Sequence, residues 1–277
     1  MAEIFGFDAY SPKEIAEKVE NVGVTKAQLP FMSVAMLGVL AGAFIALGAM
    51  YFTLVTCDKA LSFGLSRLLG GLTFSLGLVL VVVAGAELFT GNNLLVMAWV
   101  SKRISTKELL KNWLIVYAAN FVGAFGIALL VLLSNHWSMG GTAVGRLAVD
   151  IAAFKTSIPF WEAFFKGVLC NLLVCLAVWL TLAGRSVMDK IAAIIFPISA
   201  FVAAGFEHSI ANMYFIPLGI MLHKMGIGSG LQNTDGLNLY GFAHNLIPVT
   251  LGNIIGGSVL VALVYYVVYR RAPKTHE

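Results

Sequence analysis

Six apolar segments run through this chain of 277 residues, and each is long enough to cross a lipid bilayer. A helix needs about 20 predominantly apolar residues to span the hydrocarbon core. Charged residues make up only 12% of the chain, against about a quarter in a typical soluble domain. The sequence therefore predicts an all-α polytopic membrane protein with six transmembrane helices. The segments lie at residues 31–56, 66–100, 112–134, 160–183, 189–222 and 243–269.

Positive charges are divided unevenly between the connections of these segments. The two tails and the connections around residues 101–111 and 184–190 hold twelve Lys and Arg, whereas the alternate connections hold five. Because cytoplasmic loops carry the excess of Lys and Arg, both termini are predicted to be cytoplasmic. We expect the bacterial cell (inner) membrane as the location. The predicted parts are a cytoplasmic N-terminal segment (1–30), a first three-helix repeat (31–134), an external loop (135–159), a second three-helix repeat (160–269) and a cytoplasmic tail (270–277).

The two halves of the chain share three motifs in the same order. Their offsets of 129, 120 and 133 residues favour a duplication. Because three spans per half is an odd number, the second half must be inverted in the membrane, as in many transporters and channels. The motif pairs are "FMSVAMLGVLAG" from Phe31 with "FWEAFFKGVLCN" from Phe160, "GAELFTGN" from Gly85 with "GFEHSIAN" from Gly205, and "NWLIVYAANFVG" from Asn112 with "NLIPVTLGNIIG" from Asn245.

The second and fifth segments are interrupted at equivalent places, in "GAELFTGN" and "GFEHSIAN". Irregular backbone cannot face lipid, because its N–H and C=O groups would lack partners, so it must be buried or line a path. Broken helices also present N-terminal ends, whose free N–H groups suit a small anion. The alternative is that these glycines only kink two helices for packing. Two equivalent interruptions that both contain Glu and Asn favour a permeation path.

His208 follows the glutamate of the second interruption, and Leu88 stands at the equivalent position of the first. This asymmetry favours one site at the pseudo-symmetric centre, where the histidine donates a hydrogen bond or a proton to a passing anion. A histidine with a purely structural role is the alternative. Two carboxylates facing the path would repel an anion, so both glutamates are interpreted as structural. The predicted structural residues of the helix breaks are Gly85, Glu87, Gly205, Glu207, Asn92 and Asn212.

Other classes of function find little support in the sequence. There is no nucleophile elbow, no P-loop and no pair of catalytic carboxylates, so we expect no enzyme activity. The three cysteines (Cys57, Cys170 and Cys175) suggest neither a disulfide framework nor a metal site. We expect no metal or other cofactor, and the net charge of +4 does not indicate nucleic-acid binding. An aquaporin-like channel for neutral solutes would show Asn-Pro-Ala twice, and the chain contains no such tripeptide.

The motifs together resemble the formate/nitrite transporter family over nearly the whole chain. The resemblance is carried by "GGLTFSLGLVLVVVAGAELFTGN", "KNWLIVYAANFVGA", "CNLLVCLAVW", "GRSVMDK", "FVAAGFEHSIANMYFIP" and "NLIPVTLGNIIGG". It implies a homopentamer with one pore in each protomer. Each protomer would have six helices in an aquaporin-like arrangement, with the second and fifth broken.

The resemblance also implies roles for single residues. His208 is similar to the family's central histidine, and Thr90 to the threonine of a mobile loop. Asn171 and Lys155 fall where the family places an asparagine near that histidine and a lysine that adds positive potential. The sequence "GNN" after Thr90 departs from relatives that carry small hydroxyl residues there. The implied apolar constrictions are formed by Phe74, Leu78, Leu88, Phe89 and Phe201.

These observations predict a channel or transporter for a small monovalent anion, with formate as the first choice. Nitrite and hydrosulfide remain alternatives within the family, and a neutral-solute channel remains a weaker one. Apolar rings would exclude hydrated ions, because stripping water from a charge in a low-dielectric constriction is costly. The expected partners are the anion, membrane lipid and further copies of the chain.

Overall fold

The computed structural model describes residues 9–271, and over this range all the regular secondary structure is helical, without a strand. Residues 1–8 and 272–277 of the two predicted cytoplasmic tails lie outside the described part. Among the described residues, five helices are long and apolar enough to cross a membrane: Phe31–Thr56, Phe63–Gly85, Thr106–Leu133, Phe160–Thr181 and Leu239–Tyr269. The fifth predicted segment is not among them, because it is divided into α8 (Val187–Ala203) and α9 (Ser209–Lys224), which have 17 and 16 residues.

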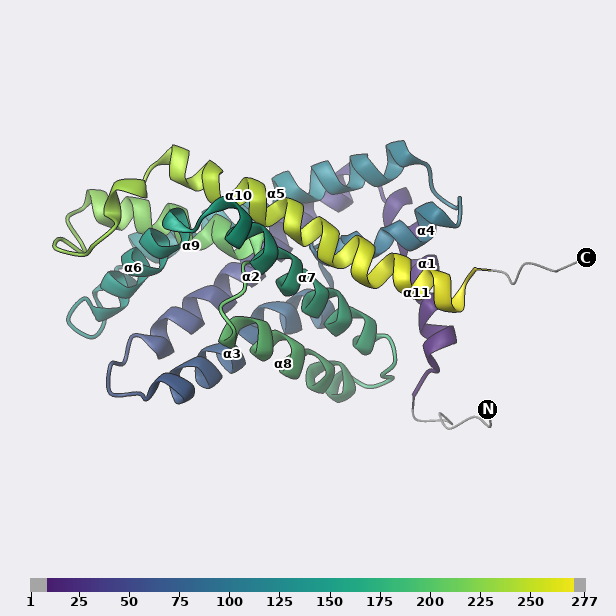
Figure 1. The fold of residues 1–277 in the computed structure, drawn as a ribbon, viewed down its shortest axis with the longest axis horizontal. Coiled ribbons are helices and arrows are strands. Elements are labelled where there is room, and N and C mark those ends of the chain that lie inside the picture. The colour runs from purple at the N-terminus through teal and green to yellow at the C-terminus, as the bar shows by residue number, and fades with distance from the viewer. Residues whose placement is uncertain (1–8, 272–277) are drawn as a thin grey trace, which may run out of the picture.

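Figure 1 shows how the helices are arranged. The N-terminal helix α1 and the C-terminal helix α11 lie at one end of the molecule, and α6 lies at the opposite end. The elements are α1 (Pro12–Gln28), α2 (Phe31–Thr56), α3 (Phe63–Val79), η1 (Leu80–Gly85), η2 (Gly91–Leu95), α4 (Val96–Val100), α5 (Thr106–Leu133), η3 (His136–Ser138), α6 (Ala143–Ser157), α7 (Phe160–Thr181), α8 (Val187–Ala203), α9 (Ser209–Lys224), η4 (Thr234–Gly236), α10 (Leu239–Ile254), η5 (Ile255–Leu263) and α11 (Val264–Tyr269).

The segment 135–159, expected to be a loop, is largely helical. It contains the 15-residue helix α6, which packs against α9. One face of α6 carries small buried residues, namely Ala148, Ala152 and Ala153. These alanines let α9 approach closely, and they place the last turn of α6, with Lys155, beside the second helix break.

Three helices begin with the same capping arrangement. At the start of α1, the backbone N–H of Ser11 donates to Glu14 Oε2 at 2.7 Å, and the Glu14 N–H donates back to Ser11 Oγ. Such a capping box satisfies two backbone donors that the helix leaves free. The hydrogen bonds from Ser11 also lower the pKa of the Glu14 carboxyl. The same arrangement joins Ser105 to Glu108 in α5 and Ser186 to Asp189 in α8.

Glycine allows two pairs of helices to pack with their backbones in close contact. A Cβ at Gly42 of α2 would overlap the carbonyl oxygen of Asn120 in α5, and a Cβ at Gly123 of α5 would overlap that of Val39. The same relation holds between α10 and α7, where a Cβ at Gly252 would overlap the carbonyl of Phe164. Small residues at helix contacts are a common device of membrane proteins.

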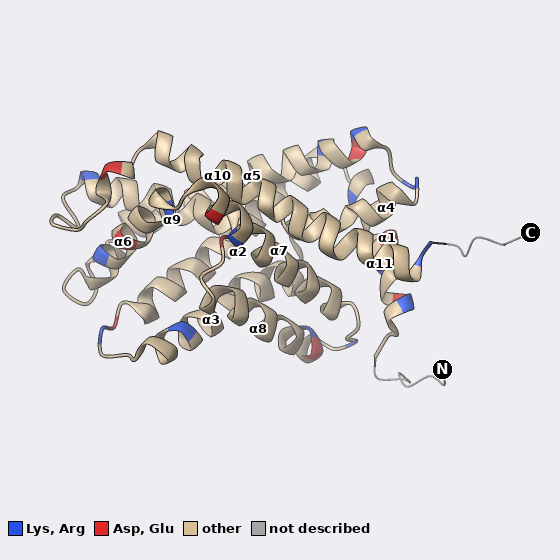
Figure 2. Ribbon diagram, in the orientation of Figure 1, with Lys and Arg blue, Asp and Glu red and all other residues tan. Residues whose placement is uncertain are grey.

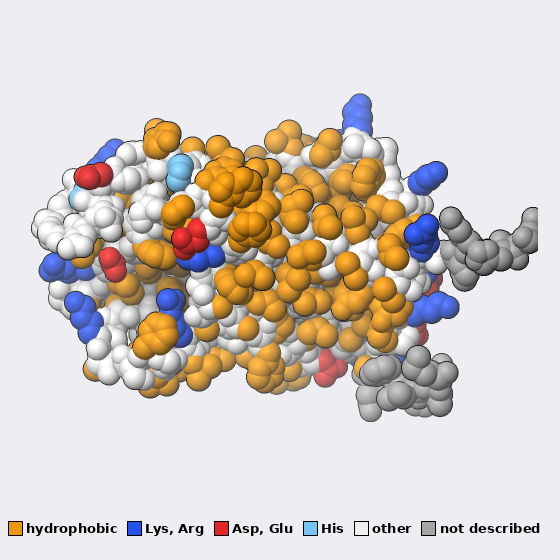
Figure 3. Space-filling view, in the orientation of Figure 1, with side chains coloured by type: hydrophobic (Ala, Val, Ile, Leu, Met, Phe, Trp, Pro, Cys, Tyr) orange, Lys and Arg blue, Asp and Glu red, His pale blue; other side chains and the backbone are white. Residues whose placement is uncertain are grey.

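Charged and apolar side chains separate along the long axis of the molecule. Figure 2 shows Lys, Arg, Asp and Glu gathered at the two ends, with an acidic and a basic residue near the start of α7 as the clearest exception. Figure 3 shows apolar side chains covering the middle of this face. Large apolar side chains point outward from the apolar helices: Leu114 of α5 is 72% exposed and Phe196 of α8 is 77% exposed. An apolar belt between polar ends is the surface expected of a bilayer-spanning protein.

Candidate functional site

Two helices end inside the molecule, and a glycine with positive φ lies at the end of each. The helix formed by α3 and η1 ends at Gly85, which has φ of +84°, and α8 ends just before Gly205, which has φ of +74°. This left-handed conformation is open to glycine but strained for residues with a Cβ. The helices resume at Gly91 and Ser209. Each break therefore spans a few residues of extended chain near the middle of the molecule.

The first break is held by a buried cluster around Glu87. Lys26 of α1 places Nζ 3.0 Å from Glu87 Oε1, and Asn92 Nδ2 donates to Glu87 Oε2 at 2.7 Å. Asn92 also donates to Asn112 Oδ1, and the Asn112 amide donates to the Lys26 carbonyl. The carboxylate is only 5% exposed. A buried carboxylate of this kind is tolerated because an ammonium and an amide compensate its charge.

The second break repeats this cluster around Glu207. Lys155 of α6 places Nζ 2.7 Å from Glu207 Oε1, and Asn212 Nδ2 donates to Glu207 Oε2 at 2.7 Å. Asn212 donates to Asn245 Oδ1, and the Asn245 amide donates to the Lys155 carbonyl. The same residue types thus make the same contacts at both breaks. Both glutamates are turned into the protein framework, so neither offers a free charge to a passing anion.

Two further asparagines tie down the irregular backbone. Asn120 of α5 accepts the Phe89 N–H at 2.9 Å and donates to the carbonyls of Gly38 and Glu87. Asn253 of α10 likewise accepts the Ser209 N–H at 3.0 Å and donates to the carbonyls of Gly167 and Glu207. One amide thereby satisfies the backbone groups that each break leaves unpaired, as burial requires.

His208 lies at the start of α9 and uses both ring nitrogens. Its Nδ1 accepts the backbone N–H of Ala211 at 3.1 Å, which caps the helix. A neutral ring that accepts at Nδ1 carries its proton on Nε2, and Nε2 lies 3.1 Å from Thr90 Oγ1. The contact joins the two breaks directly. Asn171 supports it from α7 by donating to the Thr90 carbonyl at 3.2 Å.

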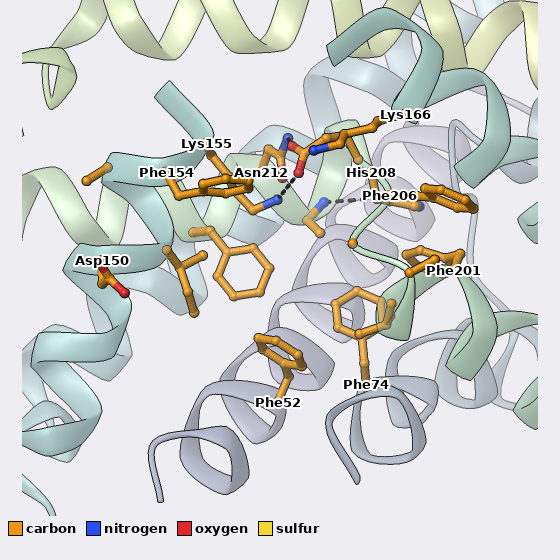
Figure 4. A pocket seen from close by; sticks show the side chains of 18 of the residues that line it. Phe52, Phe74, Asp150, Phe154, Lys155, Lys166, Phe201, Phe206, His208 and Asn212 are labelled. Carbon is orange, nitrogen blue, oxygen red and sulfur yellow. Dashed lines mark hydrogen bonds and ion pairs between the residues drawn. The ribbon is translucent and has the colours of Figure 1, made fainter. Parts of the chain in front are cut away.

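Two cavities approach this histidine–threonine pair from different parts of the fold. The α6-side cavity, of about 520 Å³, is lined by residues that include Lys155, Phe74, Phe201 and His208. Figure 4 shows Phe74, Phe201 and His208 side by side at one end of it, with Lys155 and Asp150 farther along. The α1-side cavity, of about 360 Å³, is lined by residues that include Lys26, Leu78, Leu88 and Gly91.

Apolar side chains line both cavities where the two come close to each other along α3. The rings of Phe74 and Phe201 meet edge to face with centroids 5.7 Å apart, and Phe201 stacks on the His208 ring at 6.0 Å. Leu78 follows Phe74 by one turn of α3, and with Leu88 it lines the other cavity. One helical turn is about 5.4 Å, so Phe74 and Leu78 bring the two cavities close together along α3. The four side chains of Phe74, Phe201, Leu78 and Leu88 are called the apolar barrier below.

The remaining predicted residues lie elsewhere. Phe89, expected at a constriction, lines neither cavity, and its ring contacts Tyr117 at 4.8 Å and Trp113 at 6.1 Å on α5. Asn171 is fully buried behind Thr90 and does not line either cavity. Within residues 9–271, no group of three His, Cys, Asp or Glu side chains is placed to hold a metal ion, and the three cysteines are unpaired.

Lys26 and the four asparagines that hold the breaks were not among the predicted site residues. A signal for the lysine is present, because Lys26 precedes Lys155 by 129 residues, the offset that relates Phe31 to Phe160. Asn112, Asn120, Asn245 and Asn253 are the positions that the third motif pair shares.

Comparisons with known proteins identify relatives of this chain. The family model "Formate/nitrite transporter" matches residues 13–267. The chain is 43% identical over 279 residues to "Formate channel FocA" of Escherichia coli K12 and 41% identical over 278 residues to that of Haemophilus influenzae. These alignments cover 98% of both chains in the first case, and 97% of this chain and 96% of the relative in the second.

Two solved structures share the fold. One is described as a "Pentameric formate channel with formate bound", with a TM-score of 0.80, 39% identity, and coverage of 87% of this chain and 98% of that chain. The other is an "FNT family ion channel", with a TM-score of 0.79, 30% identity, and coverage of 94% of this chain and 99% of that chain. The chain therefore belongs to the formate/nitrite transporter family.

Proposed function

We propose that this chain conducts formate across the membrane, through the path that joins the α1-side and α6-side cavities past His208 and Thr90. The observation that carries the proposal is the contact of His208 Nε2 with Thr90, in the wall of the α6-side cavity and beside the ring of Phe201. A small anion that gives up water at Phe74 and Phe201 finds a hydrogen-bond donor directly behind them. The names of the two FocA relatives and of the pentameric structure support formate as the anion.

The proposed fold has six crossings in two inverted repeats. Helices α8 and α9 would together make the fifth crossing, broken at Gly205, and α10 to α11 the sixth. The repeated contacts of Lys26 with Glu87 and of Lys155 with Glu207 support the duplication. We place both termini in the cytoplasm of a bacterial cell, with five copies of the chain assembled in the inner membrane and lipid around them.

His208 acts first as a hydrogen-bond donor in this proposal. If the neutral ring gave its Nε2 proton to formate, it would be left as an anion, because Nδ1 carries no proton while it accepts from Ala211. A charged ring that could give up a proton must instead be protonated at Nδ1. That change would break the cap of α9 and place a positive charge at the positive end of the helix. The geometry favours donation of a hydrogen bond.

A flux assay tests the proposed substrate. The purified protein is reconstituted in liposomes, and the uptake of formate, nitrite and hydrosulfide is measured across a range of pH. Formate uptake well above that of protein-free liposomes is expected, and it should exceed uptake of the other two anions at equal concentration. Faster uptake of nitrite or hydrosulfide would assign the channel to that anion, and uptake of none of the three would contradict the proposal.

A further inference from the structure

The charged residues of the α6-side cavity differ in how they are paired. Three cations line it: Arg67, Lys155 and Lys166. Lys155 Nζ lies 2.7 Å from a Glu207 oxygen, and Lys166 Nζ lies 2.6 Å from a Glu162 oxygen. Arg67 has no carboxylate oxygen within 4.0 Å among residues 9–271. Its guanidinium therefore supplies positive charge that no adjacent carboxylate offsets.

Arg67 also lies on the same face of α3 as Phe74 of the apolar barrier. It precedes Phe74 on α3 by seven residues, which is two helical turns, so both side chains lie on the same face about 10 Å apart along the axis. Its terminal nitrogens lie 3.9 and 4.0 Å from the point that a Cβ at Gly205 would occupy. The guanidinium thus rests against the second helix break, outside the Phe74–Phe201 pair. The Phe63 ring, 5.4 Å away, is its aromatic neighbour.

Two acidic residues line this cavity: Glu207, which is paired with Lys155, and Asp150. Asp150 is exposed, and no cation lies within 4.0 Å of it in the described part of the chain. Figure 4 places it at the end of the cavity away from Phe201 and His208. Since Arg67 adjoins Gly205, the positive charge lies nearer the barrier than the negative charge does. An anion that enters the cavity is therefore drawn inward.

We propose that Arg67 is the residue that attracts small monovalent anions to the mouth of the barrier, ahead of Phe74 and Phe201. The inference rests on the proposed function, because it assigns Arg67 to the entry step of that path. Lys155, although nearer in sequence to the second break, is neutralised by Glu207 and serves to hold the break. A charge at a cleft entrance raises the local concentration of the opposite ion, and salt weakens this effect.

The local potential can be measured without transport. A cysteine replaces Ala204, an exposed residue of the cavity wall next to Gly205, in a Cys57→Ser background where Cys170 and Cys175 stay buried. The full chain in detergent reacts with an anionic methanethiosulfonate, the 2-sulfonatoethyl reagent, and with the neutral methyl reagent. The ratio of the two rates reports the potential, because the thiolate fraction cancels between them.

Arg67→Gln should lower the anionic-to-neutral ratio about threefold or more at low salt, and Arg67→Lys should keep it near the parent value. Lys59→Gln, which removes an exposed charge that lines neither the α6-side nor the α1-side cavity, should leave the ratio unchanged. In about 1 M salt, where the screening length is about 3 Å, the effect of Arg67→Gln should vanish.

An unchanged ratio in Arg67→Gln at low salt would overturn the inference, and so would a fall that persists in 1 M salt, since that indicates a change of structure. The flux of formate is measured in parallel. A salt-dependent ratio together with no formate uptake by the parent protein would contradict the proposed function and leave the role of Arg67 in attracting anions standing.

Discussion

At the scale of single residues, His208 combines two tasks that its two ring nitrogens keep apart. Nδ1 caps α9 by accepting the Ala211 N–H, and Nε2 faces Thr90. The first contact is structural, and in the proposed path Nε2 is the group that meets the passing anion. Variants that preserve one nitrogen at a time can separate the two tasks.

The pair His208→Asn and His208→Gln makes this separation. Asparagine places its oxygen near the Nδ1 position, so it should keep the cap and lose the donor toward Thr90. Glutamine places its amide nitrogen near the Nε2 position, so it should keep the donor and lose the cap, at a cost of about 1 kcal/mol in stability. If donation of a hydrogen bond suffices, formate flux should be higher in His208→Gln than in His208→Asn.

Liposome uptake at several pH values measures this prediction, and the thermal stability of the detergent-solubilised protein measures the cap. A glutamine amide does not titrate near neutral pH, so if the ring only donates a hydrogen bond, the glutamine variant should conduct with the same pH dependence as the parent. Loss of flux in both variants, with a folded protein in each, would show that conduction needs proton transfer from the ring.

At the scale of elements, the two breaks depend on glycine for a conformational reason and not for space. A Cβ at Gly205 would meet only the Arg67 guanidinium at 3.9 Å, and a Cβ at Gly85 would meet nothing within 4 Å. The positive φ angles of +74° and +84° are what other residues resist. The backbone preference of glycine and the Glu–Lys clusters together determine where the two helices break.

Gly205→Ala should consequently destabilise the fold by about 1–2 kcal/mol through backbone strain alone. Gly64→Ala is the matched control, because Gly64 lies in α3, has no positive φ and has open space around it. The control should leave stability unchanged or raise it slightly, since alanine favours a helix. Thermal unfolding of both variants in detergent measures the difference, and equal stabilities would show that the second break tolerates other conformations.

The breaks themselves were predictable from sequence, since glycine, a buried glutamate and asparagine recur in both halves. Lys26 was missed because a lysine in a mixed-charge tail looks like a solvated residue, and only its offset from Lys155 indicates otherwise. Phe89 shows a different limit. It is adjacent to Leu88 in an extended stretch, and backbone angles decide which of two neighbours faces the path. The helix α6 was expected to be a loop, because its buried face consists largely of small residues such as Ala148 and Ala152, whose hydrophobic signal is weak although they recur at helical spacing.

At the scale of the whole molecule, the candidate site lies where the two halves of the chain differ. The glutamate, lysine and asparagine clusters are repeated, whereas His208 and Leu88 stand at equivalent positions and differ in chemistry. The proposed path between the cavities has an aromatic side, formed by Phe74 and Phe201, and an aliphatic side, formed by Leu78 and Leu88. In this proposal the barrier as a unit determines selectivity by size, because an anion must pass both sides.

Phe201→Ala and Leu88→Ala should each widen one side of the barrier. Removing several carbon atoms from an apolar constriction makes room for about one extra methyl group on the substrate. The ratio of acetate to formate uptake should then rise by roughly tenfold, the scale of discrimination that one such group gives in an apolar pocket. Formate uptake should persist, because His208 and Thr90 are unchanged. Competition between labelled formate and unlabelled acetate in liposomes measures the ratio.

Phe89→Ala is the control that makes this prediction sharp. It removes the same phenyl ring as Phe201→Ala, from the residue next to Leu88. The Phe89 ring, however, packs on Tyr117 and Trp113 and lines neither cavity. The variant should lose about 3–5 kcal/mol of stability and keep the acetate-to-formate ratio of the parent. A rise of the ratio in Phe89→Ala equal to that in Leu88→Ala would mean that general loosening, and not the width of the barrier, controls selectivity.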